Sequence, residues 1–445
     1  MRAVHWIYWA FWISHRYEAG VEHMREAGEL LLRMKSLIGW IDFSDEDQKR
    51  AQDYLRSLSE GTLDELAFGI IRDGFADLFF PATSTIMTRA RYFILVPSIY
   101  LHVLAQGDSG TKAKRNCERL ELTLRKQLIL NKSLEKTRKE EVKRYPASIY
   151  WAGLRRLGIV NRQVGSQAAY FDSMAQAIQR KVGVKDDDHN ALEPDTDSEM
   201  WDAEIVRLFE AGSIPCPDET DQFDSSIDFK MTGLESVYLR QRFREAEKDS
   251  VVTNVFRKNS FVPASYPWQW DYPENLKTQI EHAQHFSMLT KIATLLYYQM
   301  LDSRRQANGY DGCSVDLMEA VETWWNQCRE SVLAWDMEQF IAWIEANQLA
   351  RGSDRNFLTK LYRLLGESGS SSELVQNTGD LIVYREKDKR PNKRRLIPGR
   401  FQNEWKLPTQ RPGFFTDPQH VPYLLDFRSG IASQIMVDVY EGLGQ

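Results

Sequence analysis

Arginine and lysine side chains are the groups in this sequence whose clustering best fits a chemical role. Two arginines lie in the block "PATSTIMTRARYF", two in "YWAGLRRLGI", and five cations in the late stretch "RPNKRRLIPGR". Clustered cations bind a nucleic-acid backbone because they release its condensed counterions. We therefore predict phosphate contacts by nine residues: Arg89, Arg91, Arg155, Arg156, Arg390, Lys393, Arg394, Arg395 and Arg400.

The block "PATSTIMTRARYF" has two interpretations. Its hydroxyl and N–H groups at a helix N-terminus, with two arginines one turn further on, would form an anion-binding nest. Alternatively, Ser84 is the N-cap of a helix and the arginines pair with acids, because buried arginines are usually paired. The acids that we expect in such pairs are Asp42, Asp73 and Asp77.

Two longer basic stretches also suit nucleic acid. Residues 111–145 are predicted to be one helix with 12 basic and 5 acidic side chains, a net charge of +7, and residues 385–406 carry 9 basic and 3 acidic ones, or +6. The alternative for the helix is a solvated surface, since acids are interspersed. In the tail, Phe401 and Trp405 could stack on bases. The short helix in "YWAGLRRLGI" fits either a groove-binding or a structural role.

Metal and nuclease chemistry have fewer matching residues. The run "EHAQH" places His282 and His285 on one helical face, but two ligands do not complete a metal site. The run "GDLIVYREKDK" resembles a nuclease core with Asp380 and Glu386 as metal ligands, yet Asp388 stands where such a core needs lysine. We predict no metal site, and a divergent metal-dependent nuclease that uses Asp380 and Glu386 stays an alternative.

The common catalytic and cofactor motifs are absent. The sequence contains neither GxxxxGK[ST] nor GxGxxG, GxSxG or HExxH, and its four cysteines share no CxxC spacing. We therefore predict no cofactor and favour a protein that is not an enzyme. The cysteine usage indicates a reducing cytoplasm, and no apolar run approaches the ~18 residues of a membrane span. We expect a cytoplasmic protein without membrane contact.

The elements that must position these residues are helices, since apolar residues recur at helical spacing almost throughout. Capping signals support them: Thr62 with Glu65 forms a capping box, and Thr232 precedes "GLESVYLRQRF". The single strand that we predict is 381–384, ahead of the basic tail. The predicted fold class is mainly α: a multi-domain helical protein with a short strand-containing basic C-terminal segment.

Changes in composition suggest five segments. Residues 185–228 hold 15 acids and 2 bases, a net charge of −13, which is typical of a linker or insertion. The aromatic run "HWIYWAFWI" near the start has no small-residue cleavage site after it and marks an extension. The predicted boundaries are 1–36 (N-terminal extension), 37–184 (N-terminal helical domain), 185–231 (acidic linker or insertion), 232–372 (second helical domain) and 373–445 (basic C-terminal segment).

Several stretches resemble one bacterial family. They are "LIGWIDFSDEDQKRAQDYL", "GTLDELAFGIIRDGFADLFFPATSTIMTRARYFILVPSIY", "KRYPASIYWAGLRRLGI", "KRRLIPGRF" and "DFRSGIASQIMVDVYEGL". From about Leu37 onward the chain is similar to the family catalogued as domain of unknown function 6361. The block "FADLFFPATSTIMTRARYF" is the most specific part of the resemblance, and the tail matches the family pattern less closely.

The resemblance implies a setting rather than a mechanism. Family members have no assigned catalytic residues and lie beside helicases and phospholipase-D-type nucleases in genomic defence islands, which is an association. The predicted function is a non-enzymatic subunit of a bacterial anti-phage defence complex that binds nucleic acid such as DNA, or helicase and nuclease subunits, or both. The alternatives are the divergent nuclease and a protein–protein scaffold without nucleic-acid contact.

Overall fold

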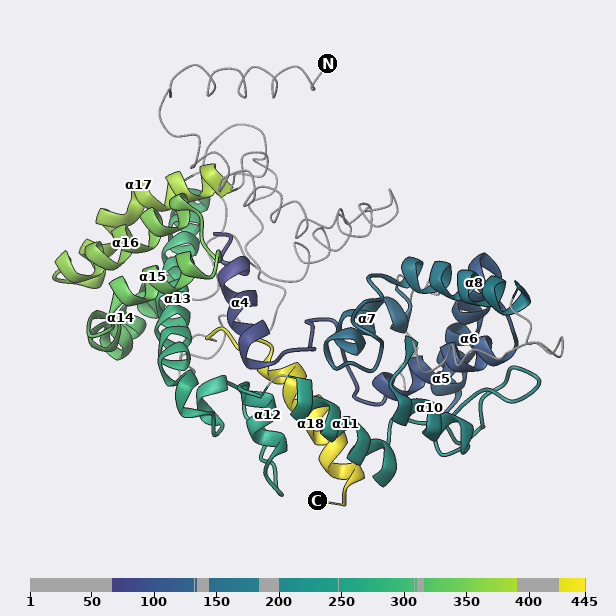
Figure 1. Cartoon of the computed structure of the whole chain (residues 1–445). Helices are drawn as coiled ribbons and strands as arrows, with labels where there is room; N and C mark the ends of the chain where they lie inside the picture. Colours follow the sequence, from purple (N-terminus) through teal and green to yellow (C-terminus); the bar gives the residue numbers. More distant parts are fainter. Residues whose placement is uncertain are drawn as a thin grey trace, which may run out of the picture. The chain divides into compact units, whose positions relative to one another are not determined.

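The computed structural model describes residues 66–131, 133, 144–183, 200–246, 248–307, 309, 316–389 and 424–444. These residues form fourteen α-helices and two short 3₁₀ helices, with no strand among them (Figure 1). The predicted fold class, mainly α, is confirmed for this part of the chain. All described residues belong to one compact unit, Glu65–Gln445. The five predicted segment boundaries stay predictions.

The first described helices pack around one apolar helix. Their bounds are α4 (Gly69–Phe79), α5 (Tyr92–Ala105), α6 (Gly110–Leu130), α7 (Pro146–Arg156) and α8 (Gln167–Gly183). Twelve of the fourteen residues of α5 are buried, so this helix provides the apolar surface on which α6 and α7 pack. Helix α8 packs in turn on α6. The charged face of α6 is therefore held in place from its inner side.

The remaining helices follow in chain order. Their bounds are α10 (Ala203–Glu210), α11 (Gly233–Ala246), α12 (Val251–Phe256), η1 (Pro267–Gln269), η2 (Glu274–Leu276), α13 (Lys277–Ala307), α14 (Leu317–Leu333), α15 (Met337–Ala346), α16 (Gly352–Glu367), α17 (Ser371–Lys389) and α18 (Ser429–Gly442). Helix α10 packs on α5, and the long helix α13 contacts α4, α14 and α17. Helix α18 packs on α11, where Gly442 lies so close that an added Cβ would clash with the Ser236 hydroxyl of α11 and lie 2.9 Å from the carbonyl oxygen of Met231, just before that helix.

The predicted strand at 381–384 was wrong, because these residues belong to α17. The buried residues Leu374, Thr378, Ile382 and Glu386 recur every four positions, which is the burial pattern of a helix face and not of a strand. The Glu386 carboxylate accepts a hydrogen bond of 2.8 Å from the Tyr297 hydroxyl on α13, which fixes that face inward. A run of four apolar or aromatic residues has too little length to separate strand from helix by composition.

Candidate nucleic-acid interface

Helix α6 presents four cations on one exposed face. Lys112, Arg115, Arg119 and Lys126 follow i, i+3, i+7 and i+14 spacing. This spacing places them within about 60° of one another around the helix axis and over a length of about 21 Å. All four residues are exposed. We call these four residues the basic stripe.

The opposite face of α6 determines which way the basic stripe points. Its buried apolar residues recur at three- and four-residue spacing and lie on the side that packs on α5 and α8: Ala113, Cys117, Leu120, Leu124 and Leu128. An amphipathic helix buries its apolar side and turns its charged side to solvent. The stripe is thus fixed outward by the packing of the helix that carries it.

One acid of α6 lies away from the basic stripe. Glu121 is 2% exposed, and its carboxylate accepts a hydrogen bond of 2.8 Å from the Ala147 amide in the first turn of α7. Burial raises the pKa of Glu121 to about 8, although this hydrogen bond acts in the opposite direction. Glu121 therefore joins α6 to α7 from the inner face and does not neutralise the stripe.

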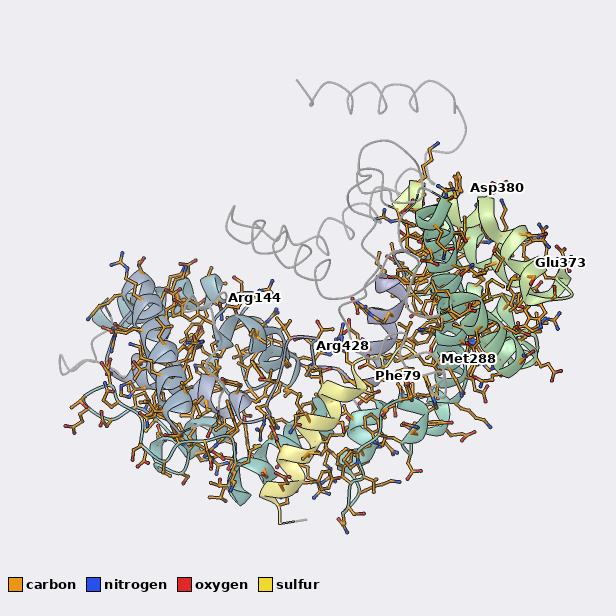
Figure 2. All side chains as sticks on the ribbon, turned by 180° about the vertical axis from the view of Figure 1, so that it is seen from behind. Phe79, Arg144, Met288, Glu373, Asp380 and Arg428 are labelled. Carbon is orange, nitrogen blue, oxygen red and sulfur yellow. The ribbon has the colours of Figure 1, made fainter. Side chains whose placement is uncertain are left out.

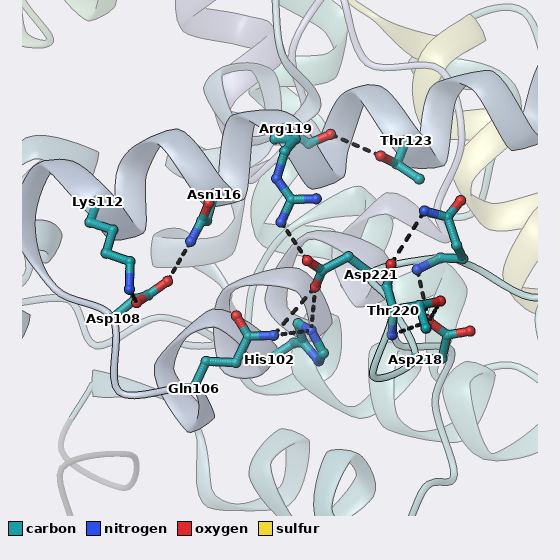
Figure 3. A network of polar contacts seen from close by, with 11 residues as sticks. His102, Gln106, Asp108, Lys112, Asn116, Arg119, Thr123, Asp218, Thr220 and Asp221 are labelled. Carbon is teal, nitrogen blue, oxygen red and sulfur yellow. Dashed lines mark hydrogen bonds and ion pairs between the residues drawn. The ribbon is translucent and has the colours of Figure 1, made fainter.

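Two cations of the basic stripe are held by acids, as Figure 3 shows. The Lys112 ammonium lies 2.5 Å from a carboxylate oxygen of Asp108, and the Arg119 guanidinium lies 2.6 Å from one of Asp221. The Lys112 and Arg119 side chains nevertheless remain 76% and 48% exposed. Arg115 and Lys126 form no ion pair with any residue in the described ranges. The stripe keeps cationic groups available to a ligand.

Asp221 is held by more than one side chain. Its carboxylate lies 3.1 Å from Nε2 of His102 and accepts a hydrogen bond of 3.3 Å from Gln106 (Figure 3). Burial alone would raise the pKa of Asp221, but hydrogen bonds from Arg119, His102 and Gln106 lower it below its ordinary value. The carboxylate is therefore anionic where it meets the basic stripe.

The arginines of the block at 81–93 are bound to carboxylates of the chain. Arg89 forms an ion pair of 2.9 Å with the fully buried Asp438 of α18. Arg91 forms ion pairs of 3.1 Å with Glu235 and 3.2 Å with Asp228. Each guanidinium would have to leave a carboxylate to reach a phosphate. Their predicted nucleic-acid contacts stay predictions, while the described contacts join the block to α11 and α18.

Two of the acids expected as partners of these arginines, Asp73 and Asp77, were wrong. Asp73 and Asp77 pair with Arg428 instead, at 3.6 Å and 2.5 Å, and Asp42 lies outside the described residues (Figure 2 labels Arg428). Arg428 precedes α18, 351 residues after Asp77 in the chain. Asp73 also pairs with its neighbour Arg72 at 3.1 Å, so the fold adds a distant cation to a local pair at Asp73 and supplies one to Asp77.

Helix α5 begins at Tyr92, so the prediction that Ser84 starts it was wrong. The amides of Thr88 and Arg89 donate to the Tyr150 hydroxyl at 3.0 and 3.1 Å, and the Ala90 amide donates to Asp438 at 2.7 Å. These partners satisfy main-chain groups that a helix would otherwise satisfy internally. The block is therefore a loop held by two side chains from distant parts of the sequence.

Arg155 and Arg156 lie at the C-terminal end of α7. Arg155 donates to the Arg162 carbonyl at 2.9 Å, and Arg162 donates to the Arg156 carbonyl at 3.2 Å. Residues 144–171 contain four arginines and no acid. Main-chain carbonyls hold Arg155 and Arg162, and the described residues give these two no carboxylate partner. Arg155 and Arg162 can therefore assist a phosphate contact with charges that no described carboxylate neutralises.

The five predicted residues of the tail lie outside the described residues: Arg390, Lys393, Arg394, Arg395 and Arg400. The same holds for the two aromatic residues expected to stack on bases, Phe401 and Trp405. Their nucleic-acid contacts stay predictions.

The two histidines of "EHAQH" have separate partners. Nδ1 of the buried His282 accepts a hydrogen bond of 2.9 Å from the Trp335 indole, and burial lowers the pKa of His282. His285 contacts the Glu281 carbonyl and the Ser331 hydroxyl at 2.8 and 3.2 Å. Among the described residues, no group of three or more His, Cys, Asp or Glu side chains could hold a metal ion.

The predicted nuclease pair is not brought together. Glu386 is fully buried, whereas Asp380 is exposed on α17 (Figure 2). Six residues of helix rotate one side chain about 120° from the other, so the two carboxylates point to different sides.

In the part of the chain that is described, no helix combines the length and apolarity needed to cross a membrane.

Sequence reasoning predicted a basic helix over 111–145, but α6 ends at Leu130, and the individual residues of the stripe were missed. Their signal was present in the spacing of 112, 115, 119 and 126, which shares one helical face. Asp221 had no such signal, because it is 102 residues from Arg119 and its contact depends on the fold.

A family model described as "Family of unknown function (DUF6361)" matches residues 35–441. This match confirms the resemblance seen in the sequence and covers most of the chain. No curated protein and no solved structure matches it. The defence-island setting stays a prediction.

Proposed function

We propose that this chain, which belongs to the family of unknown function DUF6361, binds nucleic acid through the basic stripe as a non-enzymatic subunit of a bacterial anti-phage defence complex. The observation that supports binding is the set of four exposed cations on one face of α6. The defence role rests on the family resemblance alone. The partners expected from it are a helicase and a phospholipase-D-type nuclease.

The geometry of the basic stripe suits a phosphate backbone. Four cations over about 21 Å match several successive phosphates, and each contact releases condensed counterions. This binding does not depend on sequence, because cations that contact phosphates position the ligand but read no bases. The ligand is therefore DNA or RNA of any sequence, and selectivity would come from the partner subunits.

Arg155 and Arg162 extend the same proposal. Carbonyls hold their guanidinium groups in place and leave the positive charge uncompensated by described carboxylates. Arg91, in contrast, has two carboxylate partners and serves the fold. We assign phosphate contacts first to the basic stripe, then to this cluster and to the predicted tail.

The test is binding of a fluorescein-labelled 20-nucleotide single strand and a 20-base-pair duplex, measured by anisotropy. The double variant Arg115→Gln/Lys126→Gln removes two unpaired cations of the stripe, and we expect its Kd to rise about fivefold or more. The control Lys360→Gln/Arg363→Gln removes the same charge from exposed positions on α16. An equal loss in both variants would show that net charge, and not the stripe, governs binding.

A protein–protein scaffold is the second candidate, and one surface favours it. Leu234 and Val237 are 59% and 55% exposed one turn apart on α11. Exposed apolar residues that share a helix face are typical of partner contacts. Wild-type protein that binds neither nucleic acid, yet co-purifies with a partner subunit that Leu234→Ser/Val237→Ser releases, would favour this function.

A further inference from the structure

An acidic segment of the chain lies against α6. Residues 218–228 contain five acids and no lysine or arginine. Three side chains of α6 contact this segment, and they follow one another at multiples of four residues: Arg119, Gln127 and Asn131 at the C-cap. This spacing follows one ridge of the helix, so the segment runs alongside the basic stripe and shares Arg119 with it.

The contacts along this ridge are of two kinds. Asp221 supplies a charged contact to Arg119, at 2.6 Å. Further along, the Gln127 amide donates to the Ser225 carbonyl at 3.2 Å, and the Asn131 amide donates to the Ile227 carbonyl. Only the first of these places a negative charge on the stripe. Asp221 is therefore the point at which the segment competes with an anionic ligand.

Apolar residues anchor the segment on both sides of Asp224. Phe223 and Ile227 are 6% and 5% exposed, and Phe229 just beyond is 4% exposed. Asp224 itself is exposed and binds the amide and hydroxyl of Ser226 within its own turn, at 2.7 and 2.6 Å. The segment thus stays attached through its apolar side chains even when Asp221 leaves Arg119.

We infer that residues 218–228 are an internal competitor of the nucleic acid, with the Asp221 carboxylate occupying Arg119 in the position of a phosphate. This inference rests on the proposed function. A bound backbone displaces Asp221 and takes its place on Arg119, so each binding event first breaks the ion pair. The segment therefore weakens binding and favours ligands with several phosphates in reach of the stripe over a single anion.

The test compares Asp221→Asn with Asp224→Asn in the full chain, by anisotropy with the same labelled single strand and duplex. Both variants remove one negative charge from the segment, but only the first removes a contact with the stripe. Asn suits position 221, where φ is +60°, because it tolerates left-handed backbone better than most residues. Binding no longer has to break this exposed ion pair in Asp221→Asn, so we expect the affinity of this variant to be about two- to fivefold higher than that of the wild type. Asp224→Asn should stay close to the wild type.

If the wild-type protein binds and the two variants have equal affinities, the competitor role is overturned and the proposed function stands. If neither the wild-type protein nor any variant binds nucleic acid, both the competitor role and the proposed function are overturned. Thermal melts check that each variant folds. If Asp221→Asn does not fold, the second variant is Gln106→Ala. This substitution at an exposed position removes the hydrogen bond of 3.3 Å from Gln106 to Asp221, and it changes no charge. The Kd of Gln106→Ala must be lower than that of the wild type, as expected for Asp221→Asn, and an unchanged Kd contradicts the inference.

Discussion

Arg91 and Glu235 are 144 residues apart in the sequence, and their side chains form a buried ion pair of 3.1 Å. Glu235 also accepts from the Thr232 amide at 2.7 Å, while the Thr232 hydroxyl accepts from the Glu235 amide. This is a capping box at the start of α11, in agreement with the predicted cap at Thr232. One carboxylate therefore starts a helix and joins it to the loop before α5.

Replacement of Arg91 by Met should destabilise the fold strongly. Glu235 is fully buried and would lose its cation, which costs on the order of 3–5 kcal/mol in the free energy of unfolding. The measurement is urea denaturation followed by circular dichroism. Arg363→Met is the control, because its ion pair with Glu367 is exposed and should contribute less than about 1 kcal/mol. Similar losses in both variants would mean that the buried pair is not needed for stability.

Long-range pairs of this kind mark the limit of what the sequence predicts here. Caps and helical spacing act within a few residues, so helix type and the cap at Thr232 follow from local patterns. The partners of Arg91 and Arg119 depend on which helices pack together, which no local pattern specifies. Residues 381–384 form a helix for the same reason, because the contact of Glu386 with Tyr297 is tertiary.

Glu121 should make stability fall as pH rises. Its folded pKa is raised from 4.5 to about 8, so the folded state holds a proton that the unfolded state has already lost between these values. The stabilisation is fully present below pH 4.5 and is lost as pH rises through about 8. Glu121→Gln should then be more stable than wild type at pH 9, by a few kcal/mol at most, with no advantage at pH 4.

Urea melts at pH 4, 6.5 and 9 test this expectation. The matched control is Glu118→Gln on the same helix, three residues away and less buried. A Glu121→Gln curve that runs parallel to the wild-type curve at all three pH values would contradict the protonated, buried carboxyl.

Lys291 should have the opposite effect to Glu121 and make stability rise as pH rises. It is 5% exposed on α13, and burial lowers its pKa from 10.5 to about 7. The unfolded state then binds more protons between pH 7 and 10.5, so the contribution of Lys291 to stability is present above 10.5 and is lost as pH falls through about 7. Met carries no titratable proton, so Lys291→Met does not lose this stability at low pH. The free energy of unfolding of this variant at pH 6.5 should exceed that of the wild type by up to a few kcal/mol.

The readout is the difference between Lys291→Met and wild type in urea melts at pH 6.5 and pH 10. The difference should shrink toward the higher pH. Lys360→Met, at an exposed position on α16, supplies a control in which neither pH has an effect. A difference that is constant with pH would indicate that Lys291 stays charged in the fold.

The slope of log Kd against log salt concentration for the labelled single strand tests the role of the basic stripe most directly. The four contacts of the basic stripe alone correspond to a slope of magnitude about 3, to which any contacts of Arg155, Arg162 and the tail would add, and loss of Arg115 and Lys126 should reduce the wild-type slope by about 1.5. Lys360→Gln/Arg363→Gln should keep the wild-type slope. A slope that stays the same when Arg115 and Lys126 become Gln would contradict the assignment of α6 as the nucleic-acid interface.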